Sequence, residues 1–178
     1  YQLESAWPWE HQALVRSRSV AGDPLLRASL EQLRREILTM PRQVPALSAD
    51  VRNMRHKMLT EQASMKRGGD RFDLKRDQGG IVDIEFVVQY LVLAHAAEHP
   101  ALAQWSDVIR LLATLEQVGV MTTDQSTVLS SSYLLYRSAL HGLALQGTDT
   151  LVEAAAYEAS REQVKRVTEA LLPGLQAS

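Results

Sequence analysis

Apolar residues recur along most of the chain at the three- and four-residue spacing of helices that bury one face. The clearest series covers residues 25–38, where leucine or isoleucine returns at each turn, behind Asp23 as N-cap and Pro24 in the first turn. Similar patterns predict a short helix around Trp9–Val15 and longer helices over 48–65, 107–118 and 123–147, and a last one from Thr150 or Ala156 to Leu172. The sequence therefore predicts an all-α bundle of six or seven helices.

One segment departs from this pattern. Residues 66–80 form an irregular Gly-rich loop with two glycine pairs, inside which 72–75 is the only alternating stretch. Residues 81–99 then read IVDIEFVVQYLVLAHAAEH and are apolar around most of the helical circumference, until Pro100 ends them. We expect a buried central helix that begins directly behind the loop.

The composition and charge of the chain exclude several kinds of site and partner. The chain has 178 residues, 46% hydrophobic and 22% charged, without cysteine, so disulfides and thiolate sites are excluded. No apolar run is long enough to cross a bilayer, and the first residues do not resemble a signal peptide, so a cytoplasmic location is expected. The net charge of −2 argues against a nucleic-acid partner, although residues 1–80 carry 14 basic against 10 acidic residues.

The loop and the start of the central helix hold the candidate site. A glycine pair before a helix can leave backbone N–H groups free for a phosphate, and basic residues including Lys75 lie in the same loop. The alternative is a tight turn with solvated charges, because no phosphate-loop motif follows Gly79 and Gly80. Asp83 and Glu85 point about 200° apart on a helix, so we assign them a structural role rather than metal ligation.

Two other patterns invite an interpretation. Arg52, Arg55 and His56 share one side of the predicted helix 48–65 and form a candidate partner surface. Residues 95–99, HAAEH, match the pattern of inverted zinc peptidases, but they end a helix where histidines are favourable and lack an obvious third ligand. We therefore predict no metal site and no catalytic residue in this chain.

Three blocks carry a resemblance to a known family. These are AWPWEHQALVRSRSVAGD (6–23), RFDLKRDQGGIVDIEFVVQYLVL (71–93) and WSDVIRLL (105–112). Together they resemble the C-terminal helical domain of the bifunctional glutamine synthetase adenylyltransferase/adenylyl-removing enzyme. In that family each of two polymerase-β-type nucleotidyltransferase domains is followed by a helical bundle.

The resemblance implies a role in nitrogen regulation, through ATP- and Mg²⁺-dependent transfer of AMP to a tyrosine of glutamine synthetase. It also implies glutamine synthetase and the PII signalling protein as partners. The Gly-Ser and Asp-x-Asp signatures of such transferases are missing from the sequence. We therefore expect residues 1–178 to be a single helical domain that works beside a nucleotidyltransferase domain and is inactive alone.

By the same resemblance, residues 66–85 face the catalytic cleft. Lys75 would be the phosphate-facing cation, Gly79 and Gly80 the close-approach backbone, and Asp83 and Glu85 the residues that fix the loop and the helix start. Two alternatives stay open: a regulatory module that binds PII or glutamine synthetase without nucleotide contact, and a purely structural bundle.

Overall fold

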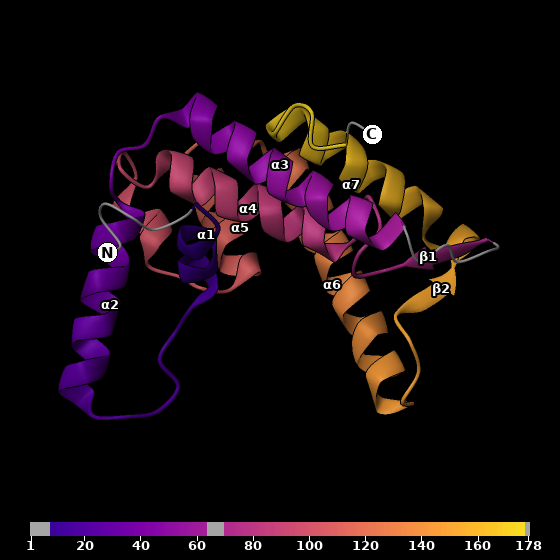
Figure 1. Cartoon of the computed structure of the whole chain (residues 1–178), viewed down its shortest axis with the longest axis horizontal. Coiled ribbons are helices and arrows are strands. Elements are labelled where there is room, and N and C mark those ends of the chain that lie inside the picture. Colours follow the sequence, from indigo (N-terminus) through magenta and orange to yellow (C-terminus); the bar gives the residue numbers. More distant parts are fainter. Residues whose placement is uncertain (1–7, 64–69, 177–178) are drawn as a thin grey trace. The chain divides into compact units, whose positions relative to one another are not determined.

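The computed structural model describes residues 8–63 and 70–176, which are mostly helical (Figure 1). In chain order the elements are α1 (Pro8–Arg16), α2 (Pro24–Leu38), α3 (Val44–Ala63), β1 (Arg71–Asp73), α4 (Ile81–His95), η1 (Pro100–Ala103), α5 (Val108–Gln117), α6 (Thr123–Leu145), β2 (Leu151–Glu153), η2 (Ala154–Tyr157) and α7 (Glu158–Leu171). Seven α-helices confirm the predicted fold class. None of the helices in the described part of the chain has the length and apolar character needed to span a membrane.

The chain divides into two compact units, one made of residues 1–51 and 88–122 and the other of residues 52–87 and 123–178. Both α3 and α4 contribute residues to each unit. The expectation of one domain over residues 1–178 stays a prediction.

The first unit is organised around the side chain of Arg34 on α2. Its guanidinium is buried and donates to the carbonyl oxygens of Leu14 and Val15 in α1, and of Ala103 and Trp105, at 2.7–2.9 Å. Burial lowers the pKa of this guanidinium. One arginine therefore joins the last turn of α1 to the segment before α5.

Helix α2 begins as predicted but buries only its last turns. The Asp23 carboxylate accepts hydrogen bonds from the amides of residues 25 and 26, which confirms the N-cap. Ile37 and Leu38 are buried, whereas Leu26 and Leu30 of the same apolar series are exposed. The spacing predicted the helix correctly, but most of its apolar stripe has no cover in the structure.

Helix α4 confirms the predicted central helix. Between residues 81 and 93 every side chain except those of Glu85 and Gln89 is buried, and the helix ends at His95, before the predicted end at residue 99. A short 3₁₀ helix, η1, follows from Pro100. Glycines in the left-handed conformation follow α5 and α6, with φ of +77° at Gly119 and +67° at Gly147.

The second unit contains a strand pair that the sequence only half predicted. β1 pairs antiparallel with β2, with Phe72 opposite Val152. Of the two predicted starts of the last helix, Thr150 is wrong, because Leu151–Glu153 is a strand, whereas Ala156 lies two residues before the observed start of α7 at Glu158. Phe72 explains this outcome: its buried ring packs against the rings of Tyr136 and Tyr157, at centroid distances of 6.1 and 6.5 Å.

Two element boundaries differ from prediction. α3 begins at Val44 and not at residue 48, and Pro45 lies in its first turn, where the missing N–H costs no helical hydrogen bond. α5 begins at Val108 and not at residue 107, because Asp107 is its N-cap and accepts with its carboxylate from the amide of Arg110.

Candidate functional site

The candidate site is the turn between β1 and α4, residues 74–80, within the second unit. Residues 66–69 of the predicted loop lie outside the described residues. Asp73 shapes the turn: its Oδ1 accepts hydrogen bonds from the amides of Lys75 and Arg76 and from the Thr150 hydroxyl, at 3.0, 3.2 and 2.8 Å. Asp77 Oδ2 in turn accepts from the amide of Asp73 at 2.8 Å. Two aspartates thus fix the backbone, as in an Asx turn.

A buried ion pair between α3 and α4 stabilises this turn. Arg55 of α3 donates through Nε to Asp83 Oδ1 of α4, and the two side chains are 0% and 1% exposed. The Nη2 of Arg55 donates to the carbonyl oxygens of Arg76 and Asp77, at 2.8 and 3.3 Å. A carboxylate buried in an apolar helix needs a partner, and an arginine of the same unit supplies it here.

The second oxygen of the Asp83 carboxylate is occupied as well. Asp83 Oδ2 accepts from the amide of Gly79 at 2.7 Å and from Nε2 of Gln176 at 2.9 Å. The backbone carbonyl oxygen of Gln176 also accepts a hydrogen bond from Nε2 of Gln78 at 3.1 Å. Asp83 therefore holds the helix start, the turn and the segment after α7 together, which fits the structural role assigned to it from the sequence.

The two glycines pack against protein, which differs from the prediction that their backbone is open to a phosphate. Gly79 has a φ of +79°, and a Cβ there would lie 2.7 Å from both Cγ and the carbonyl oxygen of Arg161 on α7. A Cβ on Gly80 would lie 2.9 Å from the carbonyl oxygens of Leu74 and Asp77. Close packing inside the unit therefore requires both glycines.

The amide groups at the start of α4 are also used internally. The amides of Gly80, Ile81 and Val82 donate to the carbonyl oxygens of Asp77, Leu74 and Lys75, at 2.9, 2.9 and 3.3 Å, and the amide of Gly79 binds Asp83. The expectation of free N–H groups for a phosphate is wrong, because each of these donors already has an acceptor.

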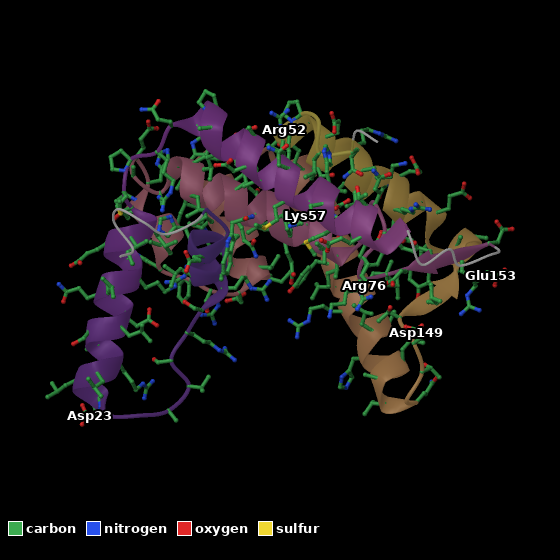
Figure 2. The ribbon with its side chains drawn as sticks, viewed as in Figure 1. Asp23, Arg52, Lys57, Arg76, Asp149 and Glu153 are labelled. Carbon is green, nitrogen blue, oxygen red and sulfur yellow. The ribbon has the colours of Figure 1, made fainter. Side chains whose placement is uncertain are left out.

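Exposed cations remain on the outside of the turn. The side chains of Lys75 and Arg76 are exposed and make no hydrogen bond or ion pair with the part of the chain that the structure describes. Arg76 is labelled in Figure 2. A negatively charged group can therefore approach these two side chains, but not the amides of the glycine pair.

Glu85 follows Asp83 by two residues on α4 and therefore points to another side of the helix. It is half-buried, and the hydroxyl of Tyr133 on α6 donates to its carboxylate at 3.4 Å. The guanidinium of Arg137 lies 5.8 Å from the centre of the Tyr133 ring. Glu85 thus connects α4 to α6, and the structure does not place it in the Asp83 cluster.

The predicted partner surface of Arg52, Arg55 and His56 is wrong for Arg55, which is fully buried. A charged group cannot remain buried without a counter-ion, and Asp83 supplies it. Arg52, labelled in Figure 2, and His56 are half-buried and contact the segment after α7. Arg52 donates to the carbonyl oxygen of Pro173 at 3.1 Å, and His56 Nε2 lies 3.0 Å from the carbonyl oxygen of Gly174.

Several residues of the site carried no functional signal in the sequence. Thr150 and Gln176 were not singled out, and neither was Arg161, whose Nε donates to the carbonyl oxygen of Gln78 at 2.9 Å and whose guanidinium lies 4.8 Å from the centre of the Phe72 ring. All three lie more than 70 residues from their partners. The one local signal was Asp73, an aspartate directly before a turn.

The described residues, 8–63 and 70–176, contain no group of three histidine, aspartate or glutamate side chains that could hold a metal ion. Burial lowers the pKa of His95, the first residue of the zinc-peptidase pattern. The resemblance implies Mg²⁺ for the full-length enzyme, and the sequence assigns none of these residues to it.

Comparison with sequence models of known families shows which family the chain belongs to. The sequence model of the family described as GlnD PII-uridylyltransferase matches residues 52–171, which include α4 and the whole candidate site. The chain belongs to the GlnD PII-uridylyltransferase family. The model described as GlnE, glutamate-ammonia ligase adenylyltransferase, matches residues 1–33. Glutamate-ammonia ligase is glutamine synthetase, so the resemblance to an adenylyltransferase-related domain is confirmed.

Proposed function

We propose that this chain is the helical domain of a glutamine synthetase adenylyltransferase and that it supports ATP-dependent transfer of AMP to a tyrosine of glutamine synthetase. In this proposal the chemistry takes place on a nucleotidyltransferase domain beside it. Two family matches support the assignment, since the uridylyltransferase model covers residues 52–171 and the adenylyltransferase model covers residues 1–33.

One observation supports this role of the site: two exposed cationic side chains extend from a turn whose backbone is fixed by hydrogen bonds within the chain. Lys75 and Arg76 extend from a backbone that Asp73 fixes from within and that the buried Arg55 fixes from α3. A rigid turn presents its charges without the entropic cost of ordering a mobile loop. The turn is therefore suited to meet a phosphate of ATP with its side chains alone.

The chain's contribution is binding and orientation. When ATP and Mg²⁺ are bound, the metal supplies charge neutralisation on the triphosphate. In this proposal Lys75 adds positive charge from the helical side, which helps to align the nucleotide for attack. In this proposal the nucleotidyltransferase domain holds the metal, because the sequence of this chain lacks the Asp-x-Asp pair that binds it.

The test is Lys75→Ala in the full-length enzyme, with Lys57→Ala as a matched control. Lys57 is an exposed lysine of α3, labelled in Figure 2, and has no hydrogen-bond partner among the described residues. We expect Lys75→Ala to lower kcat/KM for ATP about tenfold, or ~1.4 kcal/mol, because one charged hydrogen bond is lost. Lys57→Ala should leave it unchanged.

The same assay separates the rival functions. A rise in KM for glutamine synthetase with unchanged ATP kinetics would favour a docking module for that enzyme. Weakened binding of the PII protein, measured by calorimetry on the same variants, would favour a regulatory module. Unchanged behaviour of Lys75→Ala in all three measurements would leave a structural bundle.

A further inference from the structure

Thr150 lies directly before β2 and makes two contacts with the turn from which Lys75 extends. Its hydroxyl donates to Asp73 Oδ1 at 2.8 Å, and its carbonyl oxygen accepts from the amide of Leu74 at 3.2 Å. Thr150 is half-buried and follows Asp73 by 77 positions. These two contacts therefore join the turn to a distant segment of the same unit.

The Asp73 carboxylate connects Thr150 to the backbone of Lys75. Asp73 is 4% exposed. The oxygen that accepts from Thr150 also accepts from the amides of Lys75 and Arg76, at 3.0 and 3.2 Å. Those two amides belong to the turn and move with it, whereas the Thr150 hydroxyl belongs to another segment. The hydroxyl therefore fixes the carboxylate relative to the rest of the unit, and the carboxylate fixes the amide of Lys75.

The strand pair holds Thr150 itself in place. In the register of β1 and β2, Asp73 lies opposite Leu151, the residue after Thr150 (Figure 1). The same register places Phe72 opposite Val152, and the ring of Phe72 is fully buried. A shift by one residue would turn that ring out of the core, so the register and the position of Thr150 are well defined.

The position of the lysine matters because a charged hydrogen bond to a phosphate needs an accurate distance, about 2.7–2.9 Å between nitrogen and oxygen. A displacement of about 1 Å can cost an enzyme on the order of 100-fold in rate. We propose that Thr150 is a positioning residue: it acts through Asp73 and fixes the backbone from which Lys75 meets a phosphate of ATP. This inference rests on the proposed function, because it needs Lys75 to contact the nucleotide.

A double-variant cycle in the full-length enzyme tests the role of Thr150. Thr150→Val keeps the branched shape of the side chain but removes the hydroxyl, and Thr150→Ser keeps the hydroxyl. Thr148→Val is the matched control, because the hydroxyl of Thr148, in the same loop, donates to the carbonyl oxygen of Leu143 in α6 at 3.1 Å. Thr150→Val is also combined with Lys75→Ala, and kcat and KM for ATP are measured for every form.

We expect Thr150→Val to lower kcat/KM for ATP about fivefold, because a displaced ammonium keeps only part of its charged hydrogen bond. Thr150→Ser should restore most of this loss, and Thr148→Val should stay within about twofold of the unmodified enzyme. In the Lys75→Ala background, Thr150→Val should add less than about twofold, because that enzyme has no ammonium left to position.

Two kinetic results would overturn the inference: unchanged kinetics of Thr150→Val, or the same loss with and without Lys75. A substitution that merely lowered the folded fraction would give the second result, because it would reduce the activity of both backgrounds equally. Hydrogen exchange adds a measurement that needs no nucleotide. The amides of Lys75 and Arg76 should exchange about fivefold faster in Thr150→Val, and equal exchange rates would also overturn the inference.

The single variant Lys75→Ala keeps this inference apart from the proposed function. If Lys75→Ala lowers kcat/KM for ATP but Thr150→Val does not, the positioning role of Thr150 fails alone. If Lys75→Ala leaves the ATP kinetics unchanged, the proposed contact with the nucleotide fails, and the positioning role of Thr150 fails with it.

Discussion

Replacing Asp83 by Asn removes the charge that neutralises Arg55 while it preserves the size of the side chain. Asp83 is 1% exposed and Arg55 is fully buried, so water cannot replace the lost charge. The Asn side chain also replaces one of two acceptor oxygens with a donor, which then faces the amide of Gly79 or the Nε of Arg55. The substitution therefore leaves an uncompensated buried cation and one mismatched hydrogen bond.

Breaking a buried ion pair on one side costs about 3–5 kcal/mol of unfolding free energy. For a chain of 178 residues, 1 kcal/mol corresponds to roughly 2–4 °C in Tm, so we expect Asp83→Asn to lower Tm by about 6–20 °C. Urea unfolding followed by far-UV circular dichroism measures the free energy directly. The exposed Asp70 supplies the control, and Asp70→Asn should change the stability by less than ~0.5 kcal/mol.

A double variant tests the cause. Arg55→Met with Asp83→Leu removes both charges, and apolar replacements of this kind are often neutral or stabilising, so we expect it to be more stable than Asp83→Asn alone. Equal stabilities of Asp83→Asn and Asp70→Asn would refute the reasoning. The reasoning would also be refuted if the double variant lost as much unfolding free energy as Arg55→Met alone and Asp83→Leu alone lose together, because the effects of residues in contact are not additive.

Three further outcomes follow from the packing. Gly79→Ala should lower the free energy of unfolding by about 2–4 kcal/mol, because Gly79 has a left-handed φ and a Cβ there would clash with Arg161. Gly142→Ala should raise the free energy of unfolding by up to ~1 kcal/mol, because Gly142 lies inside α6 with open space around it. Arg34→Lys should cost about 2–4 kcal/mol in thermal unfolding, because one ammonium cannot reach four carbonyl oxygens. Burial opposes ionisation of Glu169, but amide donors after α7 outweigh it and lower its pKa. The carboxylate therefore stabilises the fold above the unfolded value of about 4.3 and loses this effect as pH falls through the lower folded pKa, so Glu169→Gln should flatten the stability profile there.

Each of these predictions has a contrary result. Equal changes for Gly79→Ala and Gly142→Ala would mean that the contact with α7 relaxes freely. A Tm of Arg34→Lys within ~1 °C of the unmodified chain would show that water satisfies the carbonyl oxygens instead. Parallel pH profiles of the unmodified chain and Glu169→Gln in urea unfolding would exclude a contribution from that carboxylate.

Local chemistry made the helices predictable. The Asp23 cap, the left-handed glycines that end α5 and α6, and the buried character of α4 depend on residues within a few positions of one another. Such signals can be read from neighbouring residues in the sequence alone.

The site was only partly predictable, because its contacts join distant segments. An arginine on a polar helix face reads as a surface residue, and nothing near Arg55 indicates that a carboxylate 28 positions later, at Asp83, neutralises it. The glycine pair before α4 was read as an anion-binding backbone, but the partners that fill it, including Arg161 of α7, lie about 80 residues further on. Periodicity likewise predicted the stripe of α2, but it carries no information on which part of a stripe is covered.

The strand pair and the contacts of Gln176 also bear on biosynthesis. The turn that presents Lys75 depends on residues 150–153 and on residue 176, which are synthesised about 75 and about 100 residues after Lys75. During translation this segment therefore cannot reach its final geometry until residue 176 has left the ribosome. A stop codon between residues 123 and 149 would consequently remove the partners of this distant turn, while every residue of the first unit would still be synthesised.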